Sequence, residues 1–184
     1  MELFRYLPRV MYNGALSTNL IARIALVIKN FNRFAVYYPY TVKEGERPDT
    51  IAYDYYGSSE YAWLVMIVND VYDYYTHWPL TTSEFYDYLR KKYGEVYELN
   101  SVIHHYVYTG NGEEIEEIER KSWWMTPDTF NLATEDEQLG WSPVSTFQYE
   151  LDVNESKRNI RLISNEMLSR VDRELSELFN NGAE

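Results

Sequence analysis

The sequence predicts a small α+β protein, and three observations support this fold class. A short β-type segment at residues 40–42 turns at Gly45 and leads into a helical run. Apolar residues recur at helical spacing near both ends of the chain, at residues 20–31 and 165–179. Residues 147–163 have the pattern of a β-hairpin. The length of 184 residues allows one full-sized domain, or a small domain with extensions.

The N-terminal part predicts a helix and then a strand. Ser17 or Thr18 is the candidate N-cap of the helix over residues 20–31. Residues 34–42 are β-branched and aromatic apart from Ala35 and Pro39. Because proline cannot donate to a strand ladder, Pro39 either interrupts this strand or places it at the edge of a sheet.

Residues 40–69 continue from the strand into two short predicted helices. Gly45 supplies the turn, and Pro48 suits the first helical position because its missing N–H would be unpaired there anyway. Gly57 ends the first helix, and Ser58 or Ser59 caps the second. Helices this short are unstable alone, so we expect them to pack on each other and on the strand.

An aromatic connector and a further helix follow. Residues 71–80 are rich in tyrosine and contain no long periodic stretch. Thr81, with Glu84 three positions later, predicts a capping box. The helix that it opens is expected to end at Gly94.

The C-terminal half predicts strands, a loop and a last helix. Residues 102–108 predict a strand, and residues 122–143, which lack periodicity, predict a long ordered loop. The expected hairpin pairs residues 147–153 with residues 159–163, and Ser164 caps the final helix.

The composition argues against several function classes. There are 17 Lys and Arg against 29 Asp and Glu, a formal net charge of −12, which opposes binding to nucleic acid. The absence of cysteine removes disulfides, thiolate catalysis and cysteine-based zinc sites. The apolar run at residues 20–28 is too short to cross a bilayer, and no signal-peptide pattern precedes it. We expect a soluble protein made in a cytoplasm, without nucleic-acid or membrane partners.

Aromatic residues are unusually frequent. Nineteen tyrosines and five tryptophans exceed what a core of this size needs, and both residue types are favoured at protein–protein interfaces and sugar-binding surfaces. Trp123 and Trp124 are adjacent in the segment without periodicity, where two tryptophans are hard to bury together. Two interpretations stay open: at least one anchors a partner, or both pack under the loop.

Motifs of catalysis and metal binding are weak. Nucleophile elbows, phosphate-binding glycine loops and helical His-Glu-x-x-His motifs do not occur. His104 and His105 resemble a metal pair, but adjacent residues of a regular strand point to opposite faces. The acidic run at residues 113–119 lacks the spacing of a calcium loop, and the glycosylation sequon at residues 154–156 has no secretory signal before it. We predict no enzyme, no cofactor and no metal.

The segment at residues 40–69 resembles the LysM module, a β-α-α-β unit best known for binding cell-wall glycans. The matching residues are Tyr40-Thr41-Val42-Lys43, Gly45, Ile51-Ala52, Gly57, Leu64 and Asn69. The resemblance implies a groove between the loops at residues 44–48 and 69–72, with Gly45, Glu46, Arg47 and Asn69 as groove residues. The chain departs from the LysM pattern at Gly45-Glu46-Arg47-Pro48, in a longer helical part, and in lacking a clear second-strand signature.

A second resemblance covers most of the chain and is clearest over residues 39–94. A capped, Tyr-rich helix follows the run Arg47-Pro48, Tyr56-Gly57, Trp63, Asn69-Asp70, Tyr72-Asp73, Tyr75 and Trp78. This pattern is similar to a baseplate wedge protein of contractile-tailed bacteriophages, a family with a degenerate LysM-like core and helices at both ends. The resemblance implies a non-enzymatic protein that clamps wedge subunits together and joins neighbouring wedges around the central hub.

The leading hypothesis is therefore a structural subunit of the virion tail baseplate, assembled in the host cytoplasm. Its expected partners are other baseplate wedge and hub proteins in a hetero-oligomeric assembly, bound through Tyr72, Tyr74, Tyr75, Trp78, Trp123 and Trp124. The expected division is an N-terminal extension (1–36), a LysM-like core with the following helix (37–94) and a C-terminal region (95–184). The alternative is a peptidoglycan-binding LysM module for cell-wall attachment, and a tail-associated hydrolase comes third.

Overall fold

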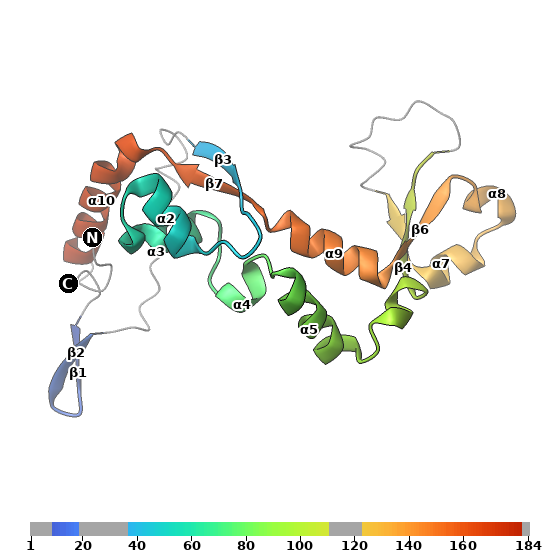
Figure 1. The fold of residues 1–184 in the computed structure, drawn as a ribbon, viewed down its shortest axis with the longest axis horizontal. Coiled ribbons are helices and arrows are strands. Elements are labelled where there is room, and N and C mark those ends of the chain that lie inside the picture. Colours follow the sequence, from blue (N-terminus) through green and yellow to red (C-terminus); the bar gives the residue numbers. More distant parts are fainter. Residues whose placement is uncertain (1–8, 19–36, 111–122, 182–184) are drawn as a thin grey trace. The chain divides into compact units, whose positions relative to one another are not determined.

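The computed structural model describes residues 9–18, 37–110 and 123–181 (Figure 1). Their mixture of helices and strands confirms the predicted α+β class. The chain divides into two compact units, here called unit 1 (Met1–Trp78 with Arg158–Glu184) and unit 2 (Pro79–Lys157). The division expected at residues 36 and 94 does not coincide with these units, because the chain leaves unit 1 after Trp78 and returns to it at Arg158.

The N-terminal described segment is a tight hairpin. Strand β1 (Arg9–Tyr12) pairs antiparallel with β2 (Ala15–Thr18). Asn13 and Gly14 between them have φ angles of 49° and 81°, as a tight two-residue hairpin turn requires. The helix predicted over residues 20–31 lies outside the described residues.

The sheet of unit 1 joins segments from distant parts of the sequence. Strand β3 (Tyr37–Thr41) pairs antiparallel with β7 (Asn159–Ile163) in a two-stranded sheet. The Val42 N–H donates to the Arg158 carbonyl over 2.9 Å. Because hydrogen-bonded and non-bonded pairs alternate along an antiparallel ladder, the nitrogen of Pro39 faces away from β7. The predicted edge position of Pro39 is confirmed.

Two helices follow β3 in the sequence. Helix α2 (Pro48–Tyr56) starts at Pro48 and ends at Gly57, whose φ of 79° is left-handed, as predicted. Ser58 caps a short 3-10 turn by accepting from the Glu60 N–H, and α3 (Ala62–Val68) follows. In unit 1 the chain order is β3, α2, α3, α4 (Tyr74–His77) and β7, and the chain reaches β7 only after the whole of unit 2.

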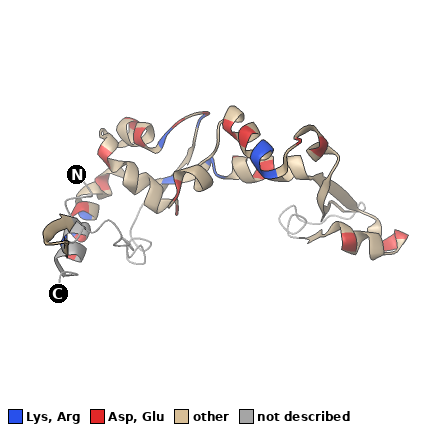
Figure 2. Ribbon diagram, turned by 90° about the horizontal axis from the view of Figure 1, so that it is seen from below, with Lys and Arg blue, Asp and Glu red and all other residues tan. Residues whose placement is uncertain are grey.

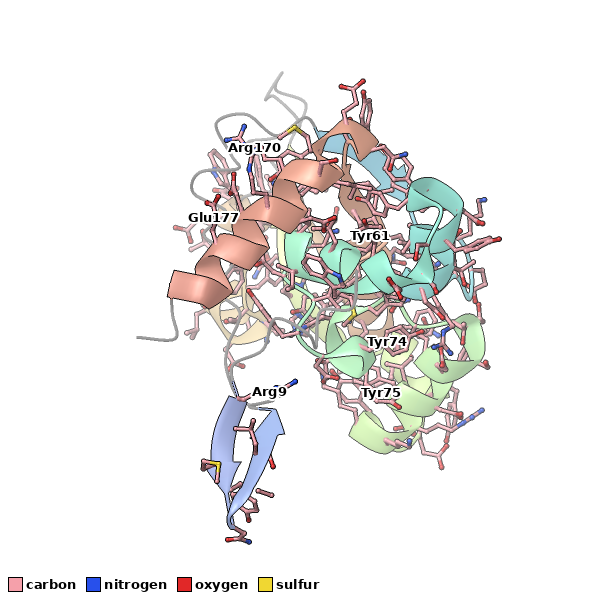
Figure 3. All side chains as sticks on the ribbon, turned by 90° about the vertical axis from the view of Figure 1, so that its left-hand side faces the viewer. Arg9, Tyr61, Tyr74, Tyr75, Arg170 and Glu177 are labelled. Atoms are coloured by element: carbon pink, nitrogen blue, oxygen red, sulfur yellow. The ribbon has the colours of Figure 1, made fainter. Side chains whose placement is uncertain are left out.

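Unit 1 is built on apolar burial. One cluster of buried residues lies between the sheet and the helices: Val42, Ile51, Ala52, Val65, Val71, Trp78, Ile160 and Leu162. A second cluster involves α10 (Leu168–Asn181), whose Val171 is fully buried beside Leu64 and Val68. Figure 3 shows α10 running past the helices that include Tyr61, and the Tyr61 hydroxyl donates to Asp172 over 3.4 Å. The capping bond predicted for Ser164 does not form, because a 3-10 turn (Asn165–Met167) precedes α10.

Unit 2 combines helices with a three-stranded antiparallel sheet. Helix α5 (Thr82–Tyr93) has the predicted Thr81–Glu84 capping box and ends at Gly94. The strands of the sheet are β4 (Ile103–Tyr108), β5 (Trp124–Met125) and β6 (Trp141–Ser145), in the order β5-β4-β6. The unit also contains a 3-10 turn (Tyr97–Asn100) and the helices α7 (Pro127–Leu132), α8 (Glu135–Gln138) and α9 (Thr146–Ser156).

Two predictions for this half of the chain are wrong. Residues 147–153 are part of α9 rather than a hairpin strand, and the true partner of β7 is β3. Residues 122–143 are not a long loop, since their described part contains β5, α7, α8 and the start of β6. For residues 147–153 the alternation of apolar and polar residues indicates a strand, but contacts that are distant in sequence favour the helix.

The interior of unit 2 is more polar than that of unit 1. Its apolar cluster consists of Phe85, Leu89 and Leu99, with Phe147 and Leu151 packed against it. The inward face of α9 bears polar side chains at a spacing of four residues: Thr146, Glu150 and Asn154. Lys92, Tyr88 and Tyr93 donate hydrogen bonds to the buried Glu150 carboxylate. The buried Asn154 side chain pairs with both backbone groups of Leu80, so the sequon amide is engaged in the fold.

Candidate partner-binding surfaces

The segment after α3, residues 72–77, exposes two tyrosine side chains to solvent. Tyr72 is 74 % and Tyr75 is 81 % exposed. Helix α4 (Tyr74–His77) is capped by Asp73, whose carboxylate accepts from the Tyr75 N–H over 3.0 Å and from the Thr76 hydroxyl over 2.7 Å. We call Tyr72 and Tyr75 the tyrosine surface. Their backbone is fixed in advance, which lowers the entropy cost of burying them against a partner.

The two other aromatic residues of this segment face inward. Trp78 is 2 % exposed, and its indole N–H donates to the Glu46 carbonyl over 2.9 Å. Tyr74 is partly buried and stacks on Trp78, with ring centroids 6.2 Å apart. Figure 3 shows Tyr74 next to Tyr75 on the same short segment. The expected anchor role of Trp78 does not fit its burial, because a core tryptophan cannot reach a partner.

Trp123 and Trp124 of unit 2 lie in separate aromatic groups. They are 48 % and 63 % exposed. Trp123 contacts Tyr108, with ring centroids 5.4 Å apart, whereas Trp124 meets the edge of His105 at 6.4 Å. Because neighbouring residues of an extended segment point to opposite sides, the two tryptophans offer one aromatic ring on each face of the sheet. We call them the tryptophan surface.

The side chains of His104 and His105 lie close together, although adjacent residues of a regular strand point to opposite faces. A register shift between Ile103 and His105 interrupts the regular alternation of β4. The Nδ1 atoms of His104 and His105 therefore come within 2.9 Å, and His104 stacks on Tyr149 with centroids 3.8 Å apart. Burial, and then the neighbouring His104, lower the pKa of His105. The described residues contain no group of three or more potential ligands that could hold a metal ion.

The residues expected to line a LysM-like groove are engaged within the chain. The Glu46 carboxylate accepts from the Tyr40 hydroxyl over 2.8 Å and from the Lys43 N–H over 2.9 Å. Gly45 provides a left-handed φ of 70° in the same turn. Arg47 is exposed and pairs with Asp49 over 3.1 Å. These contacts shape the loop that leads into α2.

Asn69, the fourth of these residues, forms its hydrogen bonds with other segments than that loop. Its side-chain amide donates to the carbonyls of Val65 and Arg161 over 2.8 and 2.9 Å, and its oxygen accepts from the Arg161 N–H over 2.9 Å. It therefore fastens the end of α3 to the edge of β7. A groove in unit 1 includes Asn69 among its lining residues, but none of Gly45, Glu46 and Arg47.

Sequence reasoning missed an exposed tip formed by α7 and α8. Leu132 at the end of α7 is 88 % exposed. Hydrogen bonds hold this tip together. Thr126 caps α7, and a Thr134–Glu137 capping box opens α8. The Gln138 side-chain amide donates to the carbonyls of Phe130 and Ala133. The Thr-Pro pair before α7 and the Thr-x-x-Glu spacing before α8 were the signals available.

The segment that bears Trp123, Trp124 and the exposed tip has an acidic surface. Residues 123–156 contain seven Asp and Glu, of which all but the buried Glu150 are exposed, and no Lys or Arg. Figure 2 shows acidic positions along α7 and α8. Such a surface favours a partner that presents basic side chains. None of the helices in the described part of the chain has the length and apolar character needed to cross a bilayer.

Exposed aromatic side chains on fixed segments, beside an acidic surface, are features of a subunit that binds other proteins. A family model described as base plate wedge protein 53 matches residues 17–178. The chain therefore belongs to the base plate wedge protein 53 family, as the sequence resemblance indicated. It is a structural protein of the phage tail baseplate, with other baseplate proteins as partners. A search of curated proteins gives no match.

Proposed function

We propose that this protein joins baseplate wedge proteins to each other and joins neighbouring wedges during baseplate assembly. The observation that supports this most is the exposure of aromatic side chains on both units, at the tyrosine surface and at the tryptophan surface. A chain with a contact surface on each of two units is suited to bridging two partners. No described feature favours glycan binding over this role, since Glu46 and Asn69 use their polar groups within the chain.

The proposed mechanism is burial of preformed aromatic anchors. Tyrosine and tryptophan bury about 150–250 Å² each, so even one such anchor supplies a sizeable part of an interface core. The acidic character of residues 123–156 adds attraction toward a basic partner surface and sets its orientation. The process involves association alone, without a covalent step.

Co-expression with the other wedge proteins of the same phage, followed by size-exclusion chromatography, tests this function. The unaltered chain is expected to co-migrate with at least one of them. Two double variants, Tyr72→Ala with Tyr75→Ala and Trp123→Ala with Trp124→Ala, are each expected to weaken binding by about tenfold or more. Because each pair lies on a different unit, the two variants should affect different partners.

Tyr97 provides the matched control. It is 71 % exposed in a 3-10 turn (Tyr97–Asn100) and belongs to neither surface. Tyr97→Ala should leave co-migration unchanged. Elution of the unaltered chain by itself would contradict the proposed function, and so would unchanged binding by both double variants.

A further inference from the structure

Unit 1 has a groove whose lining includes neither Tyr72 nor Tyr75. It has a volume of about 480 Å³ and opens beside the β3–β7 sheet and the end of α3. Pro39, Val68 and Ile160 contribute apolar lining, and Arg161 contributes a positive charge. Asp70 is another lining residue, and its carboxylate accepts a hydrogen bond from the Tyr72 hydroxyl over 3.1 Å.

The backbone of this groove is fixed by hydrogen bonds. The Asn69 side chain holds both backbone groups of Arg161 and also the Val65 carbonyl. The backbone from which the Arg161 side chain extends is therefore held in place. Fixed walls lower the entropy cost of binding a partner group.

The Arg161 guanidinium is positioned but has no acidic partner in the described part of the chain. Its Nε donates to the Val68 carbonyl over 3.3 Å, and its central carbon lies 4.9 Å from the centre of the Tyr37 ring. No carboxylate of the described residues lies within ion-pair distance of its two Nη atoms. Arg158, three residues earlier, differs because it pairs with Glu44 over 2.6 Å.

We propose that Arg161 binds a carboxylate side chain of a partner baseplate protein, while a neighbouring apolar residue of that partner contacts the exposed Pro39. A guanidinium presents its N–H groups in a fork that matches both oxygens of a carboxylate. The ring of Tyr37 holds this fork in place. The net charge of −12 and the nearby Asp70 disfavour a polyanion, so the site fits a single acidic residue. The inference rests on the proposed assembly role and adds the chemistry of one contact.

Affinity measurements with a defined probe test the proposal. The probe is the subcomplex of the other wedge proteins of the same phage, immobilised for interferometry. Arg161→Gln is expected to weaken binding by about tenfold and to reduce its salt dependence. Arg161→Lys should fall in between, because it keeps the charge and loses the bidentate fork.

A second variant keeps Arg161 but supplies a carboxylate from within the chain, which occupies the place of the partner's carboxylate. Asn159 and Arg161 are two positions apart on β7, so their side chains share one face of the strand. Asn159→Glu places a carboxylate beside the guanidinium, and it should block the partner to a similar extent. The matched control is Arg173→Gln, which removes one positive charge from an exposed position on α10 and should change affinity by less than about twofold.

The possible outcomes separate this proposal from the proposed function. Weak binding by both Arg161→Gln and Asn159→Glu, with normal thermal unfolding of the latter, supports the carboxylate site. Binding by both within about twofold of the unaltered chain overturns it and leaves the assembly role intact. Failure of the unaltered chain to bind any wedge protein overturns both.

Discussion

Unit 1 and unit 2 are stabilised by different physical means. Unit 1 buries two apolar clusters that include residues of the β3–β7 sheet, and Trp78 belongs to the larger one. Unit 2 has a smaller apolar cluster of three buried residues, and it places Glu150 and Asn154 on the inward face of α9. Unit 1 therefore depends on packing, whereas unit 2 depends on hydrogen bonds that a change of charge can remove.

The largest effect is expected from Trp78→Ala. This change removes the largest fully buried side chain of unit 1 and its hydrogen bond to Glu46. The free energy of unfolding should fall by about 3–5 kcal/mol, measured by urea-induced unfolding. Tyr75→Ala in the same segment is the control, because its exposed ring should contribute less than about 0.5 kcal/mol. Equal effects of the two variants would argue against a core centred on Trp78.

The next effect concerns the charge inside unit 2. Glu150→Gln removes the negative charge that accepts from Lys92, Tyr88 and Tyr93. Hydrogen bonds to a charged group contribute about 1.5–3 kcal/mol, and the free energy of unfolding should fall by a similar amount at neutral pH. An unfolding midpoint that does not move in urea would show that this network adds nothing to stability.

Unit 2 should also be sensitive to acid. Burial acts to raise the pKa of Glu150, but the hydrogen bonds from Lys92, Tyr93 and Tyr88 outweigh burial and lower the pKa below its ordinary value of 4.5. The stabilisation is therefore present above pH 4.5 and is lost as the pH falls through the folded-state pKa. The stability difference between the unaltered chain and Glu150→Gln should shrink across this window. A difference that stays constant with pH would refute the assignment.

The smallest effects compare two asparagines with the same bonding pattern. Asn154 pairs with both backbone groups of Leu80 in unit 2, and Asn69 does so with Arg161 in unit 1. Asn154 is 4 % exposed, so Asn154→Ala leaves unpaired groups away from water and should cost about 1–3 kcal/mol. Asn69→Ala, at a more exposed position, should cost about 1 kcal/mol. Thermal unfolding that ranks them in the opposite order would contradict this account.

The sequence was most informative where local signals decide the structure. Pro48, Gly57 and the Thr81–Glu84 capping box correctly placed the ends of α2 and α5. Such signals act between neighbouring residues through backbone conformation and orphan N–H groups, so they can be recognised without the tertiary structure.

Residues 147–153 form part of helix α9 rather than the predicted strand, and the inward face of this helix is polar. Phe147, Tyr149, Leu151 and Val153 alternate with polar residues, which is the pattern of a strand. In the fold, burial instead follows Thr146, Glu150 and Asn154, the period of a helix. Their partners, such as Lys92 and Leu80, are more than fifty residues away in sequence. No pattern within residues 147–153 reveals those contacts.

The candidate surfaces were partly predictable. Tyr72, Tyr75, Trp123 and Trp124 are exposed, whereas Trp78 is in the core. Composition indicates an excess of aromatic residues, but it cannot say which of them face outward, since that depends on packing around α4. The Arg161 groove requires the pairing of β3 with β7, and the sequence gives no local sign of that pairing.

The central claim is that the aromatic surfaces are buried against other baseplate proteins. Hydrogen–deuterium exchange of the chain alone and within the wedge assembly tests it most directly. The account predicts slower exchange on assembly at residues 72–75 and 123–125, with no change around Tyr97. Unchanged exchange at both aromatic segments in a complex that contains the chain would contradict it.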